Sequence, residues 1–292
     1  MKIAIFGDVH GNLQGLEAVL ADIIKEDPDI IVCSGDLIVP WPDSLKCWDT
    51  VQGMDIPMVR GNQEEGMLTY HGPTPDPVIH SSVRFMPVQF AAKQFNQVHI
   101  HQMKELPLTR SIVGPNHQDI LICHGMPTNT VKTFSLGIDD KITQELETVQ
   151  ETVIVAGHIH KRWHKHWNGK LLILTGSGGL PLDGQTETVD YLVLTFTKNA
   201  WEFTHKAVTY DHKGFIQRIL DSDTLTKGGP IAWIMFDQLL TQQDTLTEFF
   251  TSYLPLYRDN KINDDDLQGW EQAAIDYLQS IGRWEIVKIF FQ

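Results

Sequence analysis

Seven side chains that could bind metal ions lie just after short apolar runs at five places along the chain. They comprise two carboxylates, one amide and four imidazoles: Asp8, His10, Asp36, Asn62, His124, His158 and His160. Mixed oxygen and nitrogen ligands of this kind suit divalent ions such as Mn, Fe, Zn and Ni. Two such ions that share a carboxylate can activate water for attack on phosphorus. The residue types therefore favour a centre with two metals that acts on phosphate esters.

Each of these residues has an ordinary structural explanation when it is considered alone. Asp36 could form a turn, Asn62 could be a turn residue, and His124 could be a buried histidine with satisfied hydrogen bonds. His158 and His160, at a spacing of two, would point to the same face of a regular strand, whereas in a turn they could reach two adjacent metals. The metal hypothesis therefore rests on the whole set, because so many ligand types at the ends of apolar runs are hard to obtain by accident.

The apolar runs predict the strands that must position these residues. In the first part of the chain, predicted strands and helices alternate, at residues 2–6, 13–24, 30–33, 44–52 and 57–60. This alternation predicts a parallel sheet. Because functional groups gather at the carboxyl ends of parallel strands, the first four candidate ligands are expected to lie together.

Further apolar runs predict a second sheet in the middle of the chain. The predicted strands are 109–113, 119–123, 152–156, 171–175, 189–196 and 201–208. The remaining candidate ligands follow two of these strands. Before them, residues 71–80 contain three prolines and are expected to form a loop, followed by a helix that ends near Gln97.

Beyond Tyr210 the pattern becomes helical. Four apolar side chains would share one face of a helix: Leu267, Trp270, Ala274 and Leu278. We therefore expect a main domain at residues 1–210 and a helical extension at 211–292 that packs on it and provides no metal ligand. Self-association through the aromatic side chains of the extension is the alternative. Residues 226–230 are expected to form a loop, since the chain has no GxxxxGK[ST] phosphate-binding motif.

The composition limits the classes of partner and compartment. The 292 residues carry a formal net charge of −14 at pH 7, with 42% hydrophobic and 21% charged residues. Duplex nucleic acid is not an expected partner, because its nonspecific binding usually requires a basic face. No apolar run approaches the roughly 20 residues of a membrane span. The three cysteines lack CxxC spacing and are expected to be buried and reduced, so we expect a cytoplasmic protein that binds no membrane.

The ordered set of motifs resembles that of the calcineurin-like metallophosphoesterase family. The family order is DxH, GD, GNH followed by an acid, a single H, and GHxH. The corresponding segments of this chain are residues 8–10, 35–36, 61–64, 124 and 157–160. The resemblance covers roughly residues 1–210. It implies an α/β fold in which two packed β-sheets are flanked by helices as a four-layer sandwich, here with a helical C-terminal extension.

The resemblance also implies a role for each matching residue. The two implied sets of ligands, joined by a bridging carboxylate from Asp36, are Asp8, His10 and His160 for one metal and Asn62, His124 and His158 for the other. The implied cofactors are thus two divalent ions, chosen from Mn, Fe, Zn and Ni. A hydroxide bridging the two ions would attack phosphorus in line. Residues 175–179 resemble the late glycine-rich loop near the family's site, with a simple strand-ending turn as the alternative.

One residue departs from the family pattern. Gln63 stands where the family has a histidine that helps to protonate the leaving oxygen. Glutamine can donate a hydrogen bond but cannot release a proton near neutral pH, so it is expected to have only a weak catalytic role. The resemblance therefore implies a hydrolase of phosphodiesters or nucleotide phosphoanhydrides, which need less protonation of the leaving group. Its substrate would be a small phosphorylated molecule such as a nucleotide. The alternative is a binding scaffold of the same fold with weak or no catalysis.

Overall fold

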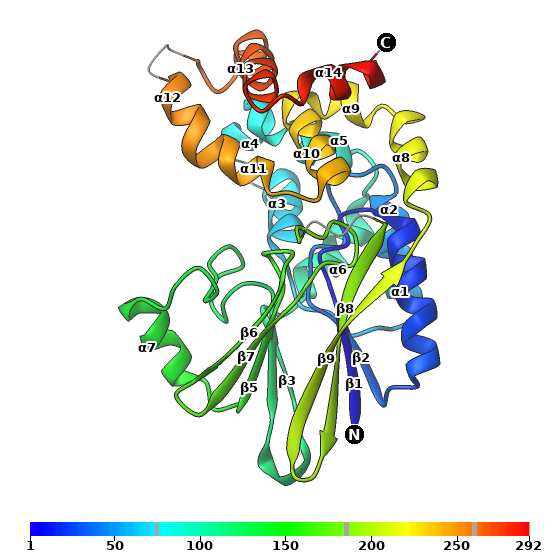
Figure 1. Cartoon of the computed structure of the whole chain (residues 1–292), viewed down its shortest axis with the longest axis vertical. Coiled ribbons are helices and arrows are strands. Elements are labelled where there is room, and N and C mark those ends of the chain that lie inside the picture. Colours follow the sequence, from blue (N-terminus) through cyan, green and yellow to red (C-terminus); the bar gives the residue numbers. More distant parts are fainter. Residues whose placement is uncertain (74–75, 184–186, 259–261, 292) are drawn as a thin grey trace.

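Two β-sheets packed face to face form the centre of the molecule, with helices on both outer faces and more helices across one end (Figure 1). The computed structural model describes residues 1–73, 76–183, 187–258 and 262–291. The expected fold class, two packed sheets flanked by helices with a helical C-terminal region, is confirmed.

The first sheet, sheet A, is built around the N-terminal strand. Its strands in spatial order are β2 (Ile30–Cys33), β1 (Lys2–Phe6), β8 (Thr188–Thr197) and β9 (Ala200–Thr209). In its register, Ile5 of β1 lies opposite Val32 of the parallel β2 and opposite Leu192 of the antiparallel β8. β1 is apolar from residue 3 to residue 6 because both of its faces are buried.

The second sheet, sheet B, has a parallel centre and antiparallel outer strands. Its strands in spatial order are β3 (Thr109–Ile112), β4 (Ile120–Cys123), β5 (Val153–Ala156), β7 (Lys170–Thr175) and β6 (Arg162–Trp167). β4, β5 and β7 run parallel to one another, so the carboxyl ends of β4 and β5 lie at the same edge of the sheet.

Alternation of side chains along the strands places apolar residues in three separate layers. In β1, Ile3 and Ile5 pack between the two sheets, whereas Ala4 and Phe6 point toward the helices that cover sheet A. In β4, Ile122 packs between the sheets and Cys123 faces the opposite outer layer. The layer between the sheets therefore fixes how the two sets of strand ends are placed relative to each other.

The helices of the first half cover the sheets and form their connections. They are α1 (Leu13–Glu26), α2 (Ser44–Gly53), α3 (Asn62–His71), α4 (Pro77–Ser81), α5 (Met86–Ala92), α6 (Gln97–Glu105) and α7 (Asp140–Thr148). α1 begins after Asn12, whose side chain accepts a hydrogen bond from the backbone N–H of Gly15 at 2.8 Å. In Figure 1, α1 and α7 lie on opposite sides of the sandwich.

Residues beyond Tyr210 form helices that lie across the upper end of the sheets in Figure 1. They are α8 (His212–Leu220), α9 (Thr224–Lys227), α10 (Gly229–Thr241), α11 (Thr245–Glu248), α12 (Leu254–Arg258), α13 (Leu267–Ser280) and α14 (Trp284–Val287). Short single turns complete the set of helices: η1 (Val83–Phe85), η2 (Pro115–His117), η3 (Phe249–Tyr253) and η4 (Lys288–Phe291). Trp270, Ala274 and Leu278 of α13 are fully buried, as the helical pattern predicts, whereas Leu267 at the start of the helix is 40% exposed.

Several predicted elements are wrong in detail. Residues 57–60 are not a strand, because only Met58 bridges to Cys33 and Pro57 has no N–H to extend the ladder. The runs predicted at 189–196 and 201–208 are strands β8 and β9, but they join sheet A instead of the second sheet. Sheet A is therefore not purely parallel, since β8 runs antiparallel to β1. The predicted loop 226–230 is wrong, because α9 and α10 leave only Gly228 between them.

The predicted end of a helix near Gln97 is also wrong, since α5 ends at Ala92 and α6 begins at Gln97. Asn96 caps α6 by accepting hydrogen bonds from the N–H groups of Val98 and His99. Within the predicted loop 71–80, Asp76 caps the short helix α4, and residues 74–75 lie outside the described part. Strand β6 and helix α7 were not anticipated.

The predicted burial of the cysteines is confirmed, since Cys33, Cys47 and Cys123 are buried and unpaired. Among the helices of the described residues, none combines the length and apolar character that a membrane span requires.

A buried ion pair fastens the end of the chain to α10, and its removal should destabilise the fold. Asp237 is fully buried and accepts a hydrogen bond from Nε of Arg283 at 2.6 Å. Arg283→Ala should lower the free energy of unfolding by about 3 kcal/mol at pH 7, because it leaves a buried carboxylate without its cation. Urea denaturation measures the loss. Arg283→Ala combined with Asp237→Asn should recover much of it, and a double variant as unstable as the single one would contradict the explanation.

Candidate metal centre and cavity

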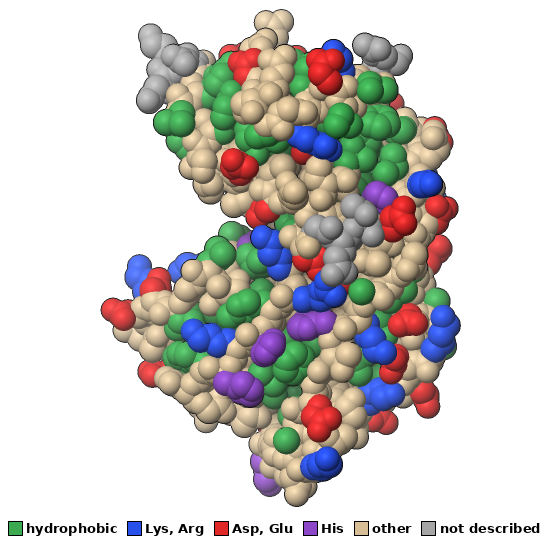
Figure 2. Space-filling view, viewed as in Figure 1, with side chains coloured by type: hydrophobic (Ala, Val, Ile, Leu, Met, Phe, Trp, Pro, Cys, Tyr) green, Lys and Arg blue, Asp and Glu red, His purple; other side chains and the backbone are tan. Residues whose placement is uncertain are grey.

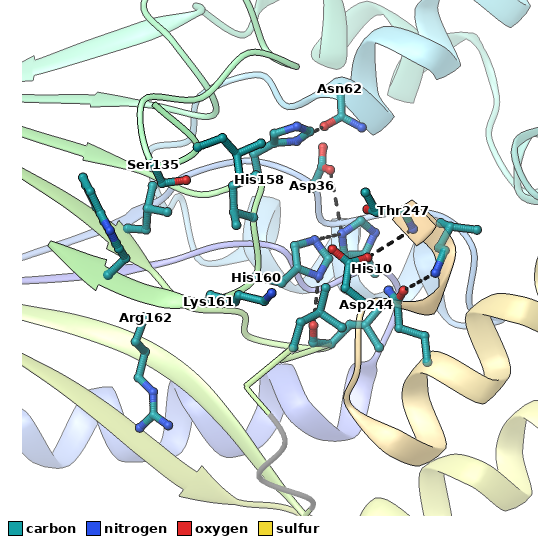
Figure 3. Close-up of a pocket in the computed structure, with 18 of the residues that line it drawn as sticks. His10, Asp36, Asn62, Ser135, His158, His160, Lys161, Arg162, Asp244 and Thr247 are labelled. Atoms are coloured by element: carbon teal, nitrogen blue, oxygen red, sulfur yellow. Dashed lines mark hydrogen bonds and ion pairs between the residues drawn. The ribbon is translucent and has the colours of Figure 1, made fainter. Parts of the chain in front are cut away.

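The structure brings all seven predicted ligand residues together at one edge of the two sheets. Six follow the carboxyl ends of β1, β2, β4 and β5, and Asn62 is the first residue of α3. Strands of sheet A therefore precede three of the seven residues, and strands of sheet B precede three others. Figure 3 shows labelled members of both halves facing one cavity.

One group of ligand atoms gathers around the Asp8 carboxylate. Nε2 of His160 lies 3.4 Å from Oδ1 of Asp8 and 3.0 Å from Nε2 of His10. Nε2 of His10 lies 3.8 Å from Oδ2 of Asp36. Asp8, His10 and His160 can thus direct one atom each at a common point, within 4.8 Å of one another.

A second group gathers around the Asn62 amide oxygen. Oδ1 of Asn62 lies 3.0 Å from Nε2 of His124 and 2.9 Å from Nδ1 of His158. Nε2 of His124 lies 3.3 Å from Oδ2 of Asp36. The same carboxylate oxygen of Asp36 therefore neighbours both groups. Asp8 also approaches the second group, at 4.0 Å from His124, so both carboxylates lie between the two points.

Hydrogen bonds to the backbone fix the orientation of three imidazoles. Nδ1 of His10 donates to the carbonyl of Val39 at 2.6 Å, and Nδ1 of His160 donates to that of Leu180 at 2.9 Å. Nδ1 of His124 does the same with Ser34 at 2.9 Å. These bonds turn each Nε2 toward the cluster, where in the neutral imidazole it offers a lone pair, as in histidines that ligate metals.

The cluster therefore contains ring nitrogens and oxygens that face one another. Nε2 of His10 and Nε2 of His160 lie 3.0 Å apart, and Nε2 of His124 lies 3.0 Å from the Asn62 oxygen. Since each Nδ1 already donates to a backbone carbonyl, these contacts are favourable only when a proton or a metal cation lies between the two atoms. The donor set thus fits two cations, one per group, and its mixture of N and O ligands fits divalent transition metals.

The pKa values show that the imidazoles of the cluster share positive charge unevenly. Burial opposes the charge of His124, but the carboxylates of Asp36 and Asp8 raise its pKa to about 10. Burial and the neighbouring imidazole of His160 lower the pKa of His10 to about 4. Although burial raises the pKa of Asp36, the adjacent histidines hold it below its usual range.

The backbone at the cluster adopts a conformation that non-glycine residues rarely use. Positive φ angles occur at Asp8 (53°), His10 (55°), Asp36 (55°), His158 (71°) and His160 (59°). Each residue in such a conformation costs about 1–3 kcal/mol, and these residues cluster at functional sites. The positive φ angles also turn His158 and His160 out of strand geometry, so each joins a different group, as predicted for a turn.

Glu64 connects the loop of Asp36 to the start of α3. Its buried carboxylate accepts hydrogen bonds from the N–H groups of Asp36 (2.9 Å), Leu37 (3.0 Å) and Gly61 (2.9 Å). Asp36 in turn accepts from the N–H of Gln63 at 2.9 Å. Burial and the Asp36 carboxylate raise the pKa of Glu64 to about 7. Glu64 thus holds ligand loops in place, a role that its position after Gln63 alone did not reveal.

The glycine-rich loop at residues 175–179 packs directly under the first ligand loop. Oγ of Ser177 donates to the carbonyl of Asp8 at 2.6 Å. A Cβ at Gly179 would lie 1.9 Å from the carbonyl oxygen of Val9, so only glycine fits there. The loop therefore holds the backbone of the first ligand loop, and none of its side chains lines the cavity.

A cavity of about 430 Å³ opens above the cluster, within the range of about 300–1,000 Å³ that ligand sites usually have. Gln63 lines it together with five candidate ligands: His10, Asp36, Asn62, His158 and His160. In Figure 2 the molecule is deeply hollowed between the helical upper part and the sheets below.

Beside apolar residues, the rest of the wall contains polar side chains that sequence reasoning missed. They are Ser135, Lys161, Arg162, Gln238, Asp244 and Thr247. Lys161 and Arg162 directly follow the GHxH segment, and that position could have identified them. The last three belong to the C-terminal helices, and no local signal in the sequence connects them with the site.

Comparison with known proteins shows which family and which solved structures the chain resembles. The model of the calcineurin-like phosphoesterase superfamily domain matches residues 1–199. A metallophosphoesterase structure from Sphaerobacter thermophilus is 24% identical, with a TM-score of 0.58, and the match covers 75% of this chain and 92% of that one. A hypothetical protein from Pyrococcus horikoshii is 15% identical, with a TM-score of 0.60 and the same coverages. These likenesses concern the fold.

A shorter match involves a curated sequence. An uncharacterized protein from Methanocaldococcus jannaschii is 33% identical over 66 residues, which are 23% of this chain and 27% of that protein. The match therefore spans about a quarter of that relative's length.

Removing the acceptor capacity of Glu64 should loosen the cluster. In Glu64→Gln the amide NH₂ must face a backbone N–H that now donates to the carboxylate. The free energy of unfolding should therefore fall by about 2 kcal/mol, the usual contribution of a hydrogen bond to a charged group. Thermal unfolding and Mn²⁺ titration calorimetry measure stability and affinity. The matched control is Glu65→Gln, whose carboxylate accepts from the Thr130 hydroxyl instead of the backbone. Equal effects of the two substitutions would contradict the role assigned to Glu64.

Proposed function

This chain belongs to the calcineurin-like phosphoesterase superfamily, and we propose that it is a two-metal hydrolase of phosphodiester or nucleotide phosphoanhydride bonds. The observation that carries the proposal is the meeting of seven metal-ligand side chains in two adjacent buried groups, with Asp36 next to both.

The residues that would hold the ions follow from the two groups. Asp8, His10 and His160 would bind one ion, and Asn62, His124 and His158 the other, with Asp36 between them. When bound, two divalent ions lower the pKa of water and take up negative charge on phosphoryl oxygens. They would be Mn, Fe, Zn or Ni, in keeping with the donor set.

The chain's own residues then decide which leaving groups are tolerated. Gln63 is half-buried at the cavity wall, and its backbone N–H is held by Asp36. Its amide can donate a hydrogen bond to the leaving oxygen but cannot supply a proton. Aryl phosphodiesters and phosphoanhydrides release groups that need little protonation, so they are the preferred substrate classes.

The number of bound metals tests the proposal most directly. Folded protein saturated with Mn²⁺ should contain two ions per chain by elemental analysis and should hydrolyse bis-p-nitrophenyl phosphate. Asp36→Asn should lower kcat/KM by more than about 100-fold. Mutation of a residue that only hydrogen-bonds to a metal ligand typically costs about 10–100-fold, and loss of a ligand shared by both ions should cost more. The control is Asp55→Asn, an exposed acid outside the cavity. One ion or none in folded wild-type protein would overturn the proposal.

Restoring a proton donor should change the selectivity for leaving groups. Gln63→His should raise kcat/KM on alkyl phosphate monoesters by up to about 10²–10⁴-fold, the usual size of general acid assistance. Aryl diesters should gain far less, because p-nitrophenolate departs without a proton. Gln63→Asn, which keeps an amide, is the control, and all variants are compared at equal metal content. Equal changes on both substrate types would leave Gln63 as a positioning or packing residue.

A further inference from the structure

We propose that the C-terminal helices form the specificity wall of this active site and that the wall selects phosphoesters carrying a nucleoside. The inference rests on the proposed hydrolase function and concerns the part of the substrate beyond the phosphate. Figure 3 shows α11, with Asp244 and Thr247, on one side of the cavity and Ser135, Lys161 and Arg162 on the other. The candidate metal ligands lie between the two sides.

The helical side of the cavity presents hydrogen-bonding groups. Gln238 of α10 is only 3% exposed, and its Oε1 accepts from the N–H of Leu246 at 3.1 Å. Its Nε2 has no partner among the described residues and remains for a ligand. Oδ1 of Asp244 accepts from the N–H of Thr247 at 3.2 Å, which leaves Oδ2 and the Thr247 hydroxyl for the cavity.

These groups favour hydroxyls over a second phosphate. An aspartate carboxylate repels an anion but accepts hydrogen bonds from sugar hydroxyls, as acidic residues do with ribose in dinucleotide sites. On the opposite side, Arg162 is already held by Asp183, to which its Nε donates at 2.9 Å. Lys161 is the exposed cation beside His160, and it would face the reacting phosphate.

The sheet side adds an apolar platform for a flat ring. Leu136 is 83% exposed although it lines the cavity, next to the half-buried Trp163. The Trp163 ring is held by Phe134, with ring centroids 5.7 Å apart. Stacking of a nucleobase on an aromatic ring contributes about 1–3 kcal/mol per base. An apolar platform facing a wall of hydroxyl-binding groups fits a base joined to a sugar.

Two chromogenic diesters with the same leaving group test the inference. They are bis-p-nitrophenyl phosphate and the p-nitrophenyl ester of uridine 5′-monophosphate, so only the group that stays on phosphorus differs. Metal-loaded wild-type protein should favour the uridine ester at least about 10-fold in kcat/KM, one tenfold step being about 1.4 kcal/mol. Asp244→Asn should reduce that ratio about 10-fold, and Leu136→Ala should reduce it in the same direction.

Asn at position 244 keeps the helix cap, so the variant should fold. The control is Glu285→Gln, an acid of the extension that is 74% exposed, pairs with Lys288 and does not line the cavity. It should leave the ratio unchanged. A ratio near one in the wild type, or an unchanged ratio in Asp244→Asn, would overturn the inference.

A binding measurement tests the nucleoside inference separately from the proposed hydrolase function. Uridine, which has no phosphate, should give saturation-transfer NMR signals with wild-type protein and weaker ones with Asp244→Asn. If neither ester is hydrolysed, the proposed function fails, and the NMR comparison alone then decides the inference. Equal uridine signals in both proteins would refute it.

Discussion

The apolar layer between the two sheets is the constraint on which the site depends. Ile3 and Ile5 of β1 pack in it against Ile122 of β4 and Val155 of β5. Because β1, β2, β4 and β5 all end at the same edge, their following loops must meet there. Three candidate ligands follow strands of sheet A, three follow strands of sheet B, and Asn62 begins α3. Any shift between the sheets would therefore separate them.

The backbone of the loops at this edge is strained. Five ligand residues adopt positive φ angles, which cost free energy in residues other than glycine. Glu64, the glycine-rich loop and the backbone carbonyls that receive imidazole N–H groups hold this arrangement in place. The surrounding framework thus maintains a ligand geometry that the loops alone would not adopt.

The C-terminal helices lie beyond residues 1–199, the part of this chain that the superfamily model matches. They pack on the first-half helices around α10, which is buried along most of its length. At the same time they bring Gln238, Asp244 and Thr247 to the cavity. The same metal-binding edge can therefore serve a substrate range set by a separate part of the chain.

The sequence by itself determined the identity of the candidate ligands and the existence of two sheets. Short apolar strands followed by Asp, Asn and His carry a local signal, because strand burial and ligand chemistry are both visible in residue types. Tertiary structure alone decided that Asp8, in addition to the expected Asp36, lies near both groups, since Asp8 approaches His124 only across the sheets. It also decided that Glu64 clamps the loops and that β8 runs antiparallel to β1.

The wall of the cavity shows most clearly what the sequence pattern does not reveal. A helical pattern predicted that the residues beyond 210 would pack on the main domain, because an apolar stripe must be buried. The same stripe carries no information on which polar residues of those helices face the site. Asp244 and His10 are far apart in sequence, and only the packing of α10 against the first-half helices places them on one cavity. Periodicity determines which face of a helix is buried, whereas the partner of that face is fixed by the fold as a whole.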